Sequence, residues 1–187
     1  PRETLRELLR TERYGDGLWE RNALHLRPLN YAIGLAQAAA AGGARLHEES
    51  PALALERAGQ GWRVRTAQGE IEARHVVLAC GGYLAGLEPR IDRAILPIAT
   101  YVMVTEPLGA RLRDCVNTDA AVYDSRFAFD YYRPLPDTRL LWGGRISVRD
   151  RAPQAVRDLL YRDLLRVYPQ LDGVRIDTNM HPFREDG

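Results

Sequence analysis

A continuous apolar segment followed by two glycines is the part of this sequence best suited to bind a ligand. Residues 75–80 are His-Val-Val-Leu-Ala-Cys, and Gly81 and Gly82 follow directly. Such an unbroken apolar run is typical of a strand covered on both faces of a parallel sheet. Ligands of open α/β sheets bind beyond the carboxyl ends of the strands, where glycines let the backbone approach a phosphate or a ribose. A tight strand exit that uses glycine only for its backbone freedom fits the pattern equally well.

The usual pyrophosphate-binding fingerprint, G-x-G-x-x-G, is not completed at either place where it begins. Tyr83 occupies the second glycine position after Gly81, and Glu20 replaces the last glycine of the set that starts at Gly15. We interpret the earlier segment as a turn, because no apolar strand precedes it. Cys80 is interpreted as a small buried strand residue rather than as a nucleophile.

Aromatic residues at alternate positions form a second candidate site. They share one parity and would lie on one face of an extended chain, with Arg133 next in line: Tyr123, Phe127, Phe129 and Tyr131. This face could line a pocket for an amine or amino acid, with the guanidinium binding a carboxylate. Aromatic residues at a period of two are equally typical of a sheet core. The pair Gly143-Gly144 later in the chain indicates either a bulge or a ligand packed against the backbone.

The composition excludes several other kinds of chemistry. All 26 basic residues are arginine, so this chain lacks the lysine that P-loop proteins, protein kinases and pyridoxal-phosphate enzymes require. These three classes are therefore excluded for this segment. None of the three serines lies in a G-x-S-x-G motif. Two cysteines and four widely separated histidines predict neither a disulfide framework nor a metal site. The net charge of +1 gives no reason to expect a nucleic-acid partner.

The length and composition predict a globular chain, and its two cysteines, too few for a disulfide framework, favour a reducing, cytoplasmic setting. The 187 residues correspond to about one domain, or to one domain with part of another. Apolar residues make up 45% and charged residues 27%, which suffices for a sizeable core. No apolar run reaches the roughly 20 residues of a membrane-spanning helix. The chain starts at Pro1 without an apolar leader, which we interpret as an excised or processed start.

Local periodicity predicts the elements that position these residues. Helices are expected at 4–10, 28–41 and 153–167. Short strands are expected at 44–47, 52–57, 62–66 and 70–73, where Gly-bearing turns indicate a small β-meander. A long strand is expected at 96–105, and a hairpin joins the aromatic segment to residues 138–146. The pattern thins after Leu171.

Several segments, taken in order, resemble one family of enzymes. They are Tyr14–Leu18, Leu26–Ala36, Gly43–Ala44, Val76–Tyr83, Leu96–Ile98, Val104–Leu108, Tyr131–Arg133 and Arg139–Arg145. Their order and spacing are similar to those of FAD-dependent oxidoreductases of the D-amino-acid oxidase superfamily, and most similar to its γ-glutamylputrescine oxidase branch. The similarity covers about residues 10–170, so the chain resembles a central fragment of such an enzyme.

The resemblance implies an α/β (mixed α+β) fold whose segments belong to two domains of the complete parent enzyme. Partial Rossmann-like FAD-domain elements and the β-meander would occupy residues 1–88, and a substrate domain with a mixed, largely antiparallel sheet would occupy 89–170. Residues 171–187 form a divergent tail. By position, Ser50-Pro51-Ala52 would meet the adenine end of FAD, and Ala79, Cys80, Gly81, Gly82 and Tyr83 would lie beside the dinucleotide. Tyr132 and Arg133 match a substrate-domain strand near the flavin.

The function implied is removal of a hydride from the C–N bond of a small-molecule amine or amino acid. FAD performs this chemistry, which fits a chain without lysine, nucleophile or metal ligands. We expect the isolated fragment to be inactive and to bind FAD weakly or not at all. Two alternatives stay open: a non-catalytic binding or assembly module that self-associates through an exposed FAD-domain face, and a plain α/β domain without activity.

Overall fold

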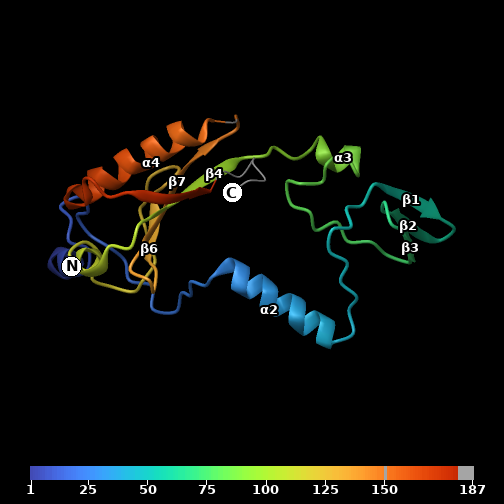
Figure 1. Ribbon diagram of the computed structural model, residues 1–187, viewed down its shortest axis with the longest axis horizontal. Helices are drawn as coiled ribbons and strands as arrows, with labels where there is room; N and C mark the ends of the chain where they lie inside the picture. The colour runs from blue at the N-terminus through green and yellow to red at the C-terminus, as the bar shows by residue number, and fades with distance from the viewer. Residues whose placement is uncertain (150, 181–187) are drawn as a thin grey trace. The chain divides into compact units, whose positions relative to one another are not determined.

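The computed structural model describes residues 1–149 and 151–180, which divide into two compact units (Figure 1). The first unit comprises Pro1–His25 and Ile98–Gly187, and the second comprises Leu26–Pro97. The first twenty-five residues therefore pack with the later part of the chain rather than with the β-meander. The assignment of each segment to a parent domain stays a prediction.

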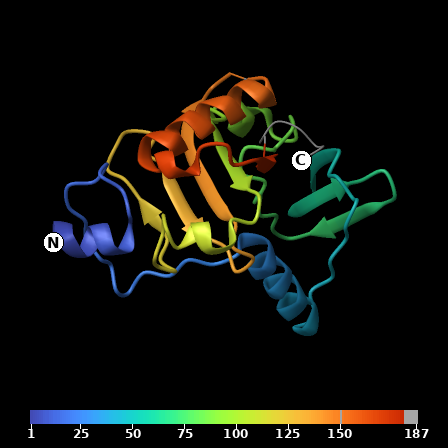
Figure 2. The ribbon, with the colours of Figure 1, turned by 60° about the vertical axis from the view of Figure 1, so that its left-hand side comes forward.

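The first unit is a five-stranded antiparallel sheet with a helix on one face. The strands have the order β5-β6-β7-β4-β8. Their bounds are Ala99–Thr105 for β4, Val122–Tyr123 for β5, Tyr131–Pro134 for β6, Leu140–Ser147 for β7 and Ile176–Met180 for β8. Helix α4, Pro153–Val167, lies along one face of this sheet (Figure 2). The predicted mixed α/β class with a largely antiparallel sheet is confirmed.

Helix α4 forms where its sequence predicts, because its apolar residues recur at helical spacing. Val156, Leu160, Leu164 and Val167 face the sheet and are at most 2% exposed. Pro153 starts the helix, and the 3₁₀ turn η2, Pro169–Leu171, follows its end.

Between α4 and the sheet lies an aromatic core. The ring of Tyr132 stacks on that of Trp142, with centroids 4.6 Å apart and planes 7° apart. The hydroxyl oxygens of Tyr132 and Tyr168 lie 2.9 Å apart, so the buried hydroxyls form a hydrogen bond. Tyr101 and Met103 of β4 complete this core and are at most 1% exposed.

The N-terminal segment is attached to the first unit through backbone hydrogen bonds. Helix α1, Arg2–Leu8, starts and ends two residues before the predicted bounds of 4–10. After it, the Arg10 amide donates to the Cys115 carbonyl at 2.9 Å, and the Asn117 amide donates to the Leu8 carbonyl at 2.7 Å. The 3₁₀ turn η1, Gly109–Leu112, precedes these partners.

The second unit contains the predicted helix and meander. Helix α2 spans Pro28–Ala41, as predicted, and α3 is a single turn at Pro89–Asp92. Strands β1 (Ala54–Ala58), β2 (Gly61–Arg65) and β3 (Glu70–Ala73) pair antiparallel in that order. Residues 44–47 are not a strand, which contradicts the prediction, because no strand among the described residues pairs with them.

Residues 75–80 also differ from their prediction. They form no strand and have no strand partner among residues 1–149 and 151–180. Val77 is 86% exposed and Cys80 is exposed. Within the described part of the chain, no neighbouring segments therefore pack on both faces of residues 75–80, as the prediction required. A parallel-type strand is stable only when neighbouring strands accept its backbone hydrogen bonds. Strand β8, in contrast, forms after Leu171, where the sequence pattern predicted no element.

Candidate functional site

One face of the five-stranded sheet is packed under α4, and the other face carries polar and aromatic side chains. Residues paired directly across antiparallel strands share a face. Tyr131 pairs with Gly143 and Gly143 with Val102, while Arg133 pairs with Leu141 and Leu141 with Val104. We call this side the open face: Thr100, Val102, Val104, Tyr131, Arg133, Leu141 and Gly143. Except for Gly143, these residues are half-buried or exposed.

The ring of Tyr131 lies across the neighbouring strand at Gly143. A Cβ atom added to Gly143 would overlap ring atoms Cζ and Cε2 of Tyr131. The side chain of Thr100 on β4, beyond β7 in the sheet, interacts with the Tyr131 hydroxyl. Burial raises the pKa of Tyr131, and the interaction with Thr100 partly opposes the rise. Gly143 is therefore buried by the ring of its cross-strand partner.

The glycine pair in β7 also adjoins a β-bulge. Thr100 pairs with Ile146 and Tyr101 with Gly144, so Arg145 is an extra residue with a φ of 65°. A Cβ added to Gly144 would lie 2.7 Å from Oδ1 of buried Asp130. Of the two interpretations of Gly143-Gly144, the bulge is thus confirmed, and the atoms against the glycines come from Tyr131 and Asp130.

The predicted aromatic face is assembled by a hairpin rather than by one extended strand. Tyr123 on β5 pairs with Tyr131 on β6, and the chain reverses between them, with Ala128 at a φ of 53°. The rings of Tyr123 and Phe129 are 5.9 Å apart, and those of Phe129 and Tyr131 are 6.0 Å apart. Phe127 is 91% exposed and does not pack into this cluster. Three of the four predicted aromatic residues therefore gather beside the open face.

Arg133 lies on the open face two residues after Tyr131. Its Nη1 is 3.1 Å from Nδ1 of His25. Because a guanidinium always carries its protons, Nδ1 of His25 must accept this hydrogen bond. The contact between the end of the N-terminal segment and β6 was not predicted, because residues 108 positions apart share no local pattern.

The neighbouring residue Tyr132 faces the opposite way. It is 1% exposed, stacked on Trp142 and hydrogen-bonded to Tyr168. Burial raises its pKa well above the ordinary tyrosine value. The structure thus gives Tyr132 a packing role, and the open face carries its neighbours Tyr131 and Arg133.

The residues predicted to adjoin a dinucleotide lie in the second unit. The Tyr83 amide donates to the Cys80 carbonyl at 3.0 Å, which closes a turn with Gly81 at a φ of 56°. Ala79, Gly82 and Tyr83 are exposed, as is Cys80, which was predicted to be buried. A Cβ added to Gly81 or Gly82 would meet no atom within 4 Å. This turn therefore presents accessible backbone.

The other predicted dinucleotide contact, Ser50-Pro51-Ala52, precedes the meander in the same unit. Ser50 is half-buried and its hydroxyl donates to the Glu48 carbonyl at 2.8 Å, while Pro51 and Ala52 are exposed.

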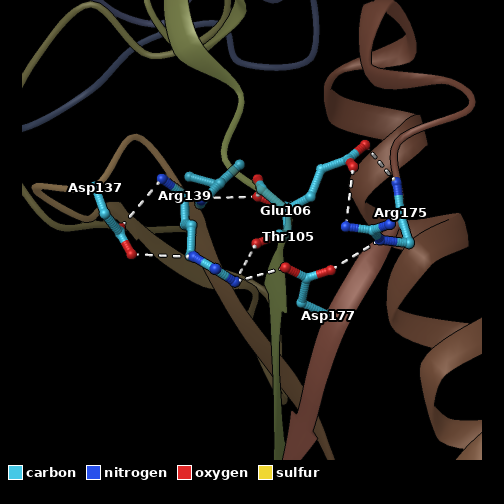
Figure 3. Close-up of polar contacts among 7 residues, drawn as sticks. Thr105, Glu106, Asp137, Arg139, Arg175 and Asp177 are labelled. Atoms are coloured by element: carbon cyan, nitrogen blue, oxygen red, sulfur yellow. Dashed lines mark hydrogen bonds and ion pairs between the residues drawn. The ribbon is translucent and has the colours of Figure 1, made fainter.

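A network of charged side chains joins the ends of three strands in the first unit (Figure 3). Arg139 Nη1 donates to Asp177 at 2.7 Å, and Arg139 Nε lies 3.0 Å from Asp137. Arg175 lies 3.0 Å from Asp177 and 3.6 Å from Glu106. These opposite charges satisfy each other, so the network fastens β8 to β4 and to the β6–β7 hairpin.

A pocket of about 340 Å³ lies nearby, beside α4. It is lined by Arg157, Asp158, Tyr161, Val174, Arg175 and Ile176. Its arginines already face carboxylates, which makes it a weaker candidate than the open face for binding an anion.

No group of three or more His, Cys, Asp or Glu side chains in residues 1–149 and 151–180 is arranged to hold a metal ion. Within the same residues, no helix combines the length and the apolar character needed to cross a bilayer.

Comparison with known sequences gives one family and several relatives. A family model described as FAD dependent oxidoreductase matches residues 1–186. Gamma-glutamylputrescine oxidoreductase of Escherichia coli is 35% identical over 175 residues, which cover 92% of this chain and 41% of that protein. A probable oxidoreductase, OrdL, of Haemophilus influenzae is 33% identical over 178 residues, covering 92% of this chain and 40% of that protein. This chain thus spans about two fifths of the length of these relatives.

Solved structures share the fold. Glycine oxidase from Geobacillus kaustophilus matches with a TM-score of 0.57 and 22% identity, over 79% of this chain and 39% of that one. L-Proline dehydrogenase from P. horikoshii matches with a TM-score of 0.62 and 18% identity, over 82% of this chain and 42% of that one.

Proposed function

Because this chain belongs to the family of FAD-dependent oxidoreductases, we propose that it is the central part of an oxidase or dehydrogenase that acts on the C–N bond of an amine or amino acid. The relatives and structural neighbours are named for γ-glutamylputrescine, glycine and L-proline, which are all compounds of this class. When bound, FAD supplies the acceptor for the hydride that leaves the carbon next to nitrogen. The residues of this chain bind and orient the reactants.

The open face carries this proposal. It places Arg133 and Tyr131, two residues apart on β6, on the same side of the sheet, which α4 does not cover. A guanidinium binds a carboxylate with two parallel hydrogen bonds, and an aromatic wall excludes water from the apolar part of a substrate. In the proposed enzyme, Arg133 anchors an anionic substrate group, and Tyr131 and Phe129 pack against its carbon atoms.

The turn Cys80–Tyr83 fits a role in holding the cofactor. Open space surrounds the α-carbons of Gly81 and Gly82, so a bulky ligand can approach the backbone there. We assign Ala79–Tyr83 to the contact with the dinucleotide and Ser50–Ala52 to its adenine end. These two contacts hold only part of a dinucleotide, so we expect this chain alone to bind FAD weakly or not at all.

The cofactor assignment is tested by the visible spectrum. The parent protein, which includes this chain, is expected to purify with a bound flavin and to be bleached under argon by a substrate. The substrates to try are γ-glutamylputrescine, glycine, sarcosine, D-alanine and L-proline. This chain alone is expected to be colourless. A parent protein without flavin, or one that none of these compounds reduces, contradicts the proposal.

Substitution of Arg133 tests the site itself. A hydrogen bond to a charged group contributes about 1.5–3 kcal/mol, so Arg133→Met is expected to raise KM for a carboxylate-bearing substrate by about 10–100-fold. Arg162→Met is the matched control, because Arg162 is exposed on α4 and its Nε donates to the Asp158 carbonyl within the same helix. If both variants keep the wild-type KM, Arg133 does not bind substrate.

A self-associating module is the second candidate, and exposed apolar side chains favour it. Helix α2 has no buried residue, and Leu29, Ile33 and Leu35 are 48–69% exposed. Val77 is 86% exposed. Size-exclusion chromatography of this chain distinguishes the cases, because a stable monomer at micromolar concentration argues against such an interface.

We also propose a cytoplasmic location for the enzyme. Cys80 and Cys115 are both unpaired, which is typical of proteins from a reducing compartment. Fractionation of cells that produce the tagged parent protein tests this, and recovery outside the cytoplasmic fraction contradicts it.

A further inference from the structure

The ring of Tyr131 reaches from β6 over Gly143 of β7 toward Thr100 of β4. Strands β6 and β4 are separated by β7. Neighbouring strands are about 4.8 Å apart, so the two backbones are about 10 Å apart. A tyrosine side chain covers most of this distance only if it lies flat along the sheet. The intervening residue on the same face is Gly143, which has no side chain to block the ring.

We propose that Gly143 is a positioning residue that sets the shape of the ligand-binding face: its missing side chain lets Tyr131 lie flat across β7 and form the floor beside Arg133. This inference rests on the proposed function of the open face, which it deepens. Any larger residue at position 143 tilts the ring out of the sheet and into the space above Arg133, where a substrate would lie.

Independent contacts hold the backbone on both sides of this pair. The buried carboxylate of Asp130, next to Tyr131, forms an ion pair with Arg126. The Oδ1 atom of Asp130 lies close to Gly144. Beyond Gly144, Arg145 leaves the strand at the bulge and donates two hydrogen bonds of 2.7 Å to Asp163 on α4. The backbones of β6 and β7 are therefore fixed, and a clash at Gly143 is relieved by rotation of the Tyr131 ring.

The ring itself has neighbours that define its position. The Phe129 ring meets it edge-on, at 6.0 Å and 65° between the planes. Partial burial raises the pKa of Tyr131. The position of the ring can therefore be measured in this chain without any cofactor or substrate.

The first experiment uses this chain labelled with 3-fluorotyrosine. The resonance of Tyr131 is identified by its loss in Tyr131→Phe, and its titration is followed by ¹⁹F NMR. Gly143→Ala is expected to move this resonance and to lower its titration midpoint toward that of a solvated fluorotyrosine. Gly34→Ala is the control, because a Cβ there meets no atom within 4 Å. An unchanged Tyr131 resonance and midpoint in folded Gly143→Ala overturn the proposal.

A double-mutant cycle gives a second measurement of the same contact from protein stability. The urea midpoint is measured for Gly143→Ala, Tyr131→Ala and the double variant. If the Tyr131 ring alone occupies the space over Gly143, Gly143→Ala is expected to lower the midpoint of the wild-type chain and to leave that of Tyr131→Ala unchanged. If Gly143→Ala lowers the midpoint equally with and without the Tyr131 ring, the effect comes from the backbone and the positioning role is overturned.

The second experiment uses the parent enzyme and separates this inference from the proposed function. Flavin reduction by γ-glutamylputrescine and by glycine is compared in wild type and Gly143→Ala. We expect kcat/KM for the larger substrate to fall at least about fivefold more than that for glycine. If wild type oxidises neither compound, the proposed function fails for these substrates, and with it the ligand-binding part of this inference. If wild type is active but the variant keeps its selectivity despite a moved ring, only the present inference is overturned.

Discussion

Asp163 is the buried charge whose removal is expected to cost most stability in the first unit. Its side chain is fully buried and accepts hydrogen bonds from Arg145 Nε and Nη2, both at 2.7 Å, and from Arg166 Nη1 at 3.0 Å. Asp163 belongs to α4 and Arg145 to the bulge of β7. The ion pair therefore ties the helix to the sheet at the point where β7 leaves its regular pairing.

The cost of Asp163→Asn follows from the exposure of the partners. Loss of one member of a fully buried ion pair costs about 3–5 kcal/mol. The side chains of Arg145 and Arg166 are 32% and 64% exposed, so both guanidiniums regain water in the variant. We therefore expect a loss of about 2–3 kcal/mol in the free energy of unfolding. With a urea slope of about 2 kcal/mol/M, the midpoint falls by about 1–1.5 M.

Urea unfolding followed by tryptophan fluorescence measures this effect. Asp158→Asn is the matched control on the same helix, because Asp158 is 57% exposed and lies 3.6 Å from Arg157. It is expected to change the free energy of unfolding by less than about 0.5 kcal/mol. The combination of Arg145→Met with Asp163→Leu should recover most of the loss, since no buried charge is left unpaired and Arg166, whose side chain is 64% exposed, is solvated by water. A midpoint for Asp163→Asn equal to that of the control would refute the reasoning.

Three further predictions concern glycines, thiols and alkaline stability. Gly144→Ala is expected to lower the urea midpoint more than Gly143→Ala does. A Cβ at position 144 would lie 3.2 Å from a backbone oxygen and 2.7 Å from a buried carboxylate oxygen, whereas a Cβ at position 143 would meet a ring that can rotate away. With Ellman's reagent, exposed Cys80 is expected to react within minutes and Cys115 only after unfolding, because burial raises the pKa of Cys115 to about 11. The folded state binds the proton of the Cys115 thiol more tightly than the unfolded state does. The contribution of this thiol to the free energy of unfolding is therefore complete below about pH 9 and is lost as pH rises through about 11. Burial raises the pKa of Tyr168 as well, so Cys115→Ala and Tyr168→Phe should each flatten the alkaline arm of a plot of urea midpoint against pH.

The local pattern of residues determined the elements whose stability is local. Helices α2 and α4 have the predicted bounds, because apolar spacing, an initial proline and a terminating Gly or Pro act within a few residues of one another. The meander and the β6–β7 hairpin followed from short strands separated by turn residues. The ordered motifs also sufficed to predict the family, because their spacing spans most of the chain.

Only the tertiary structure decided which side chains meet. Alternation shows that Tyr131 and Tyr132 lie on opposite faces, but the position of α4 decides that Tyr132 is in the core. The contact of His25 with Arg133 and the reach of Tyr131 over Gly143 join residues from different segments. Residues 75–80 have the composition of a buried strand, yet a strand forms only where a partner accepts its hydrogen bonds. Periodicity describes what one segment can do, whereas pairing and burial depend on which distant segments lie beside it.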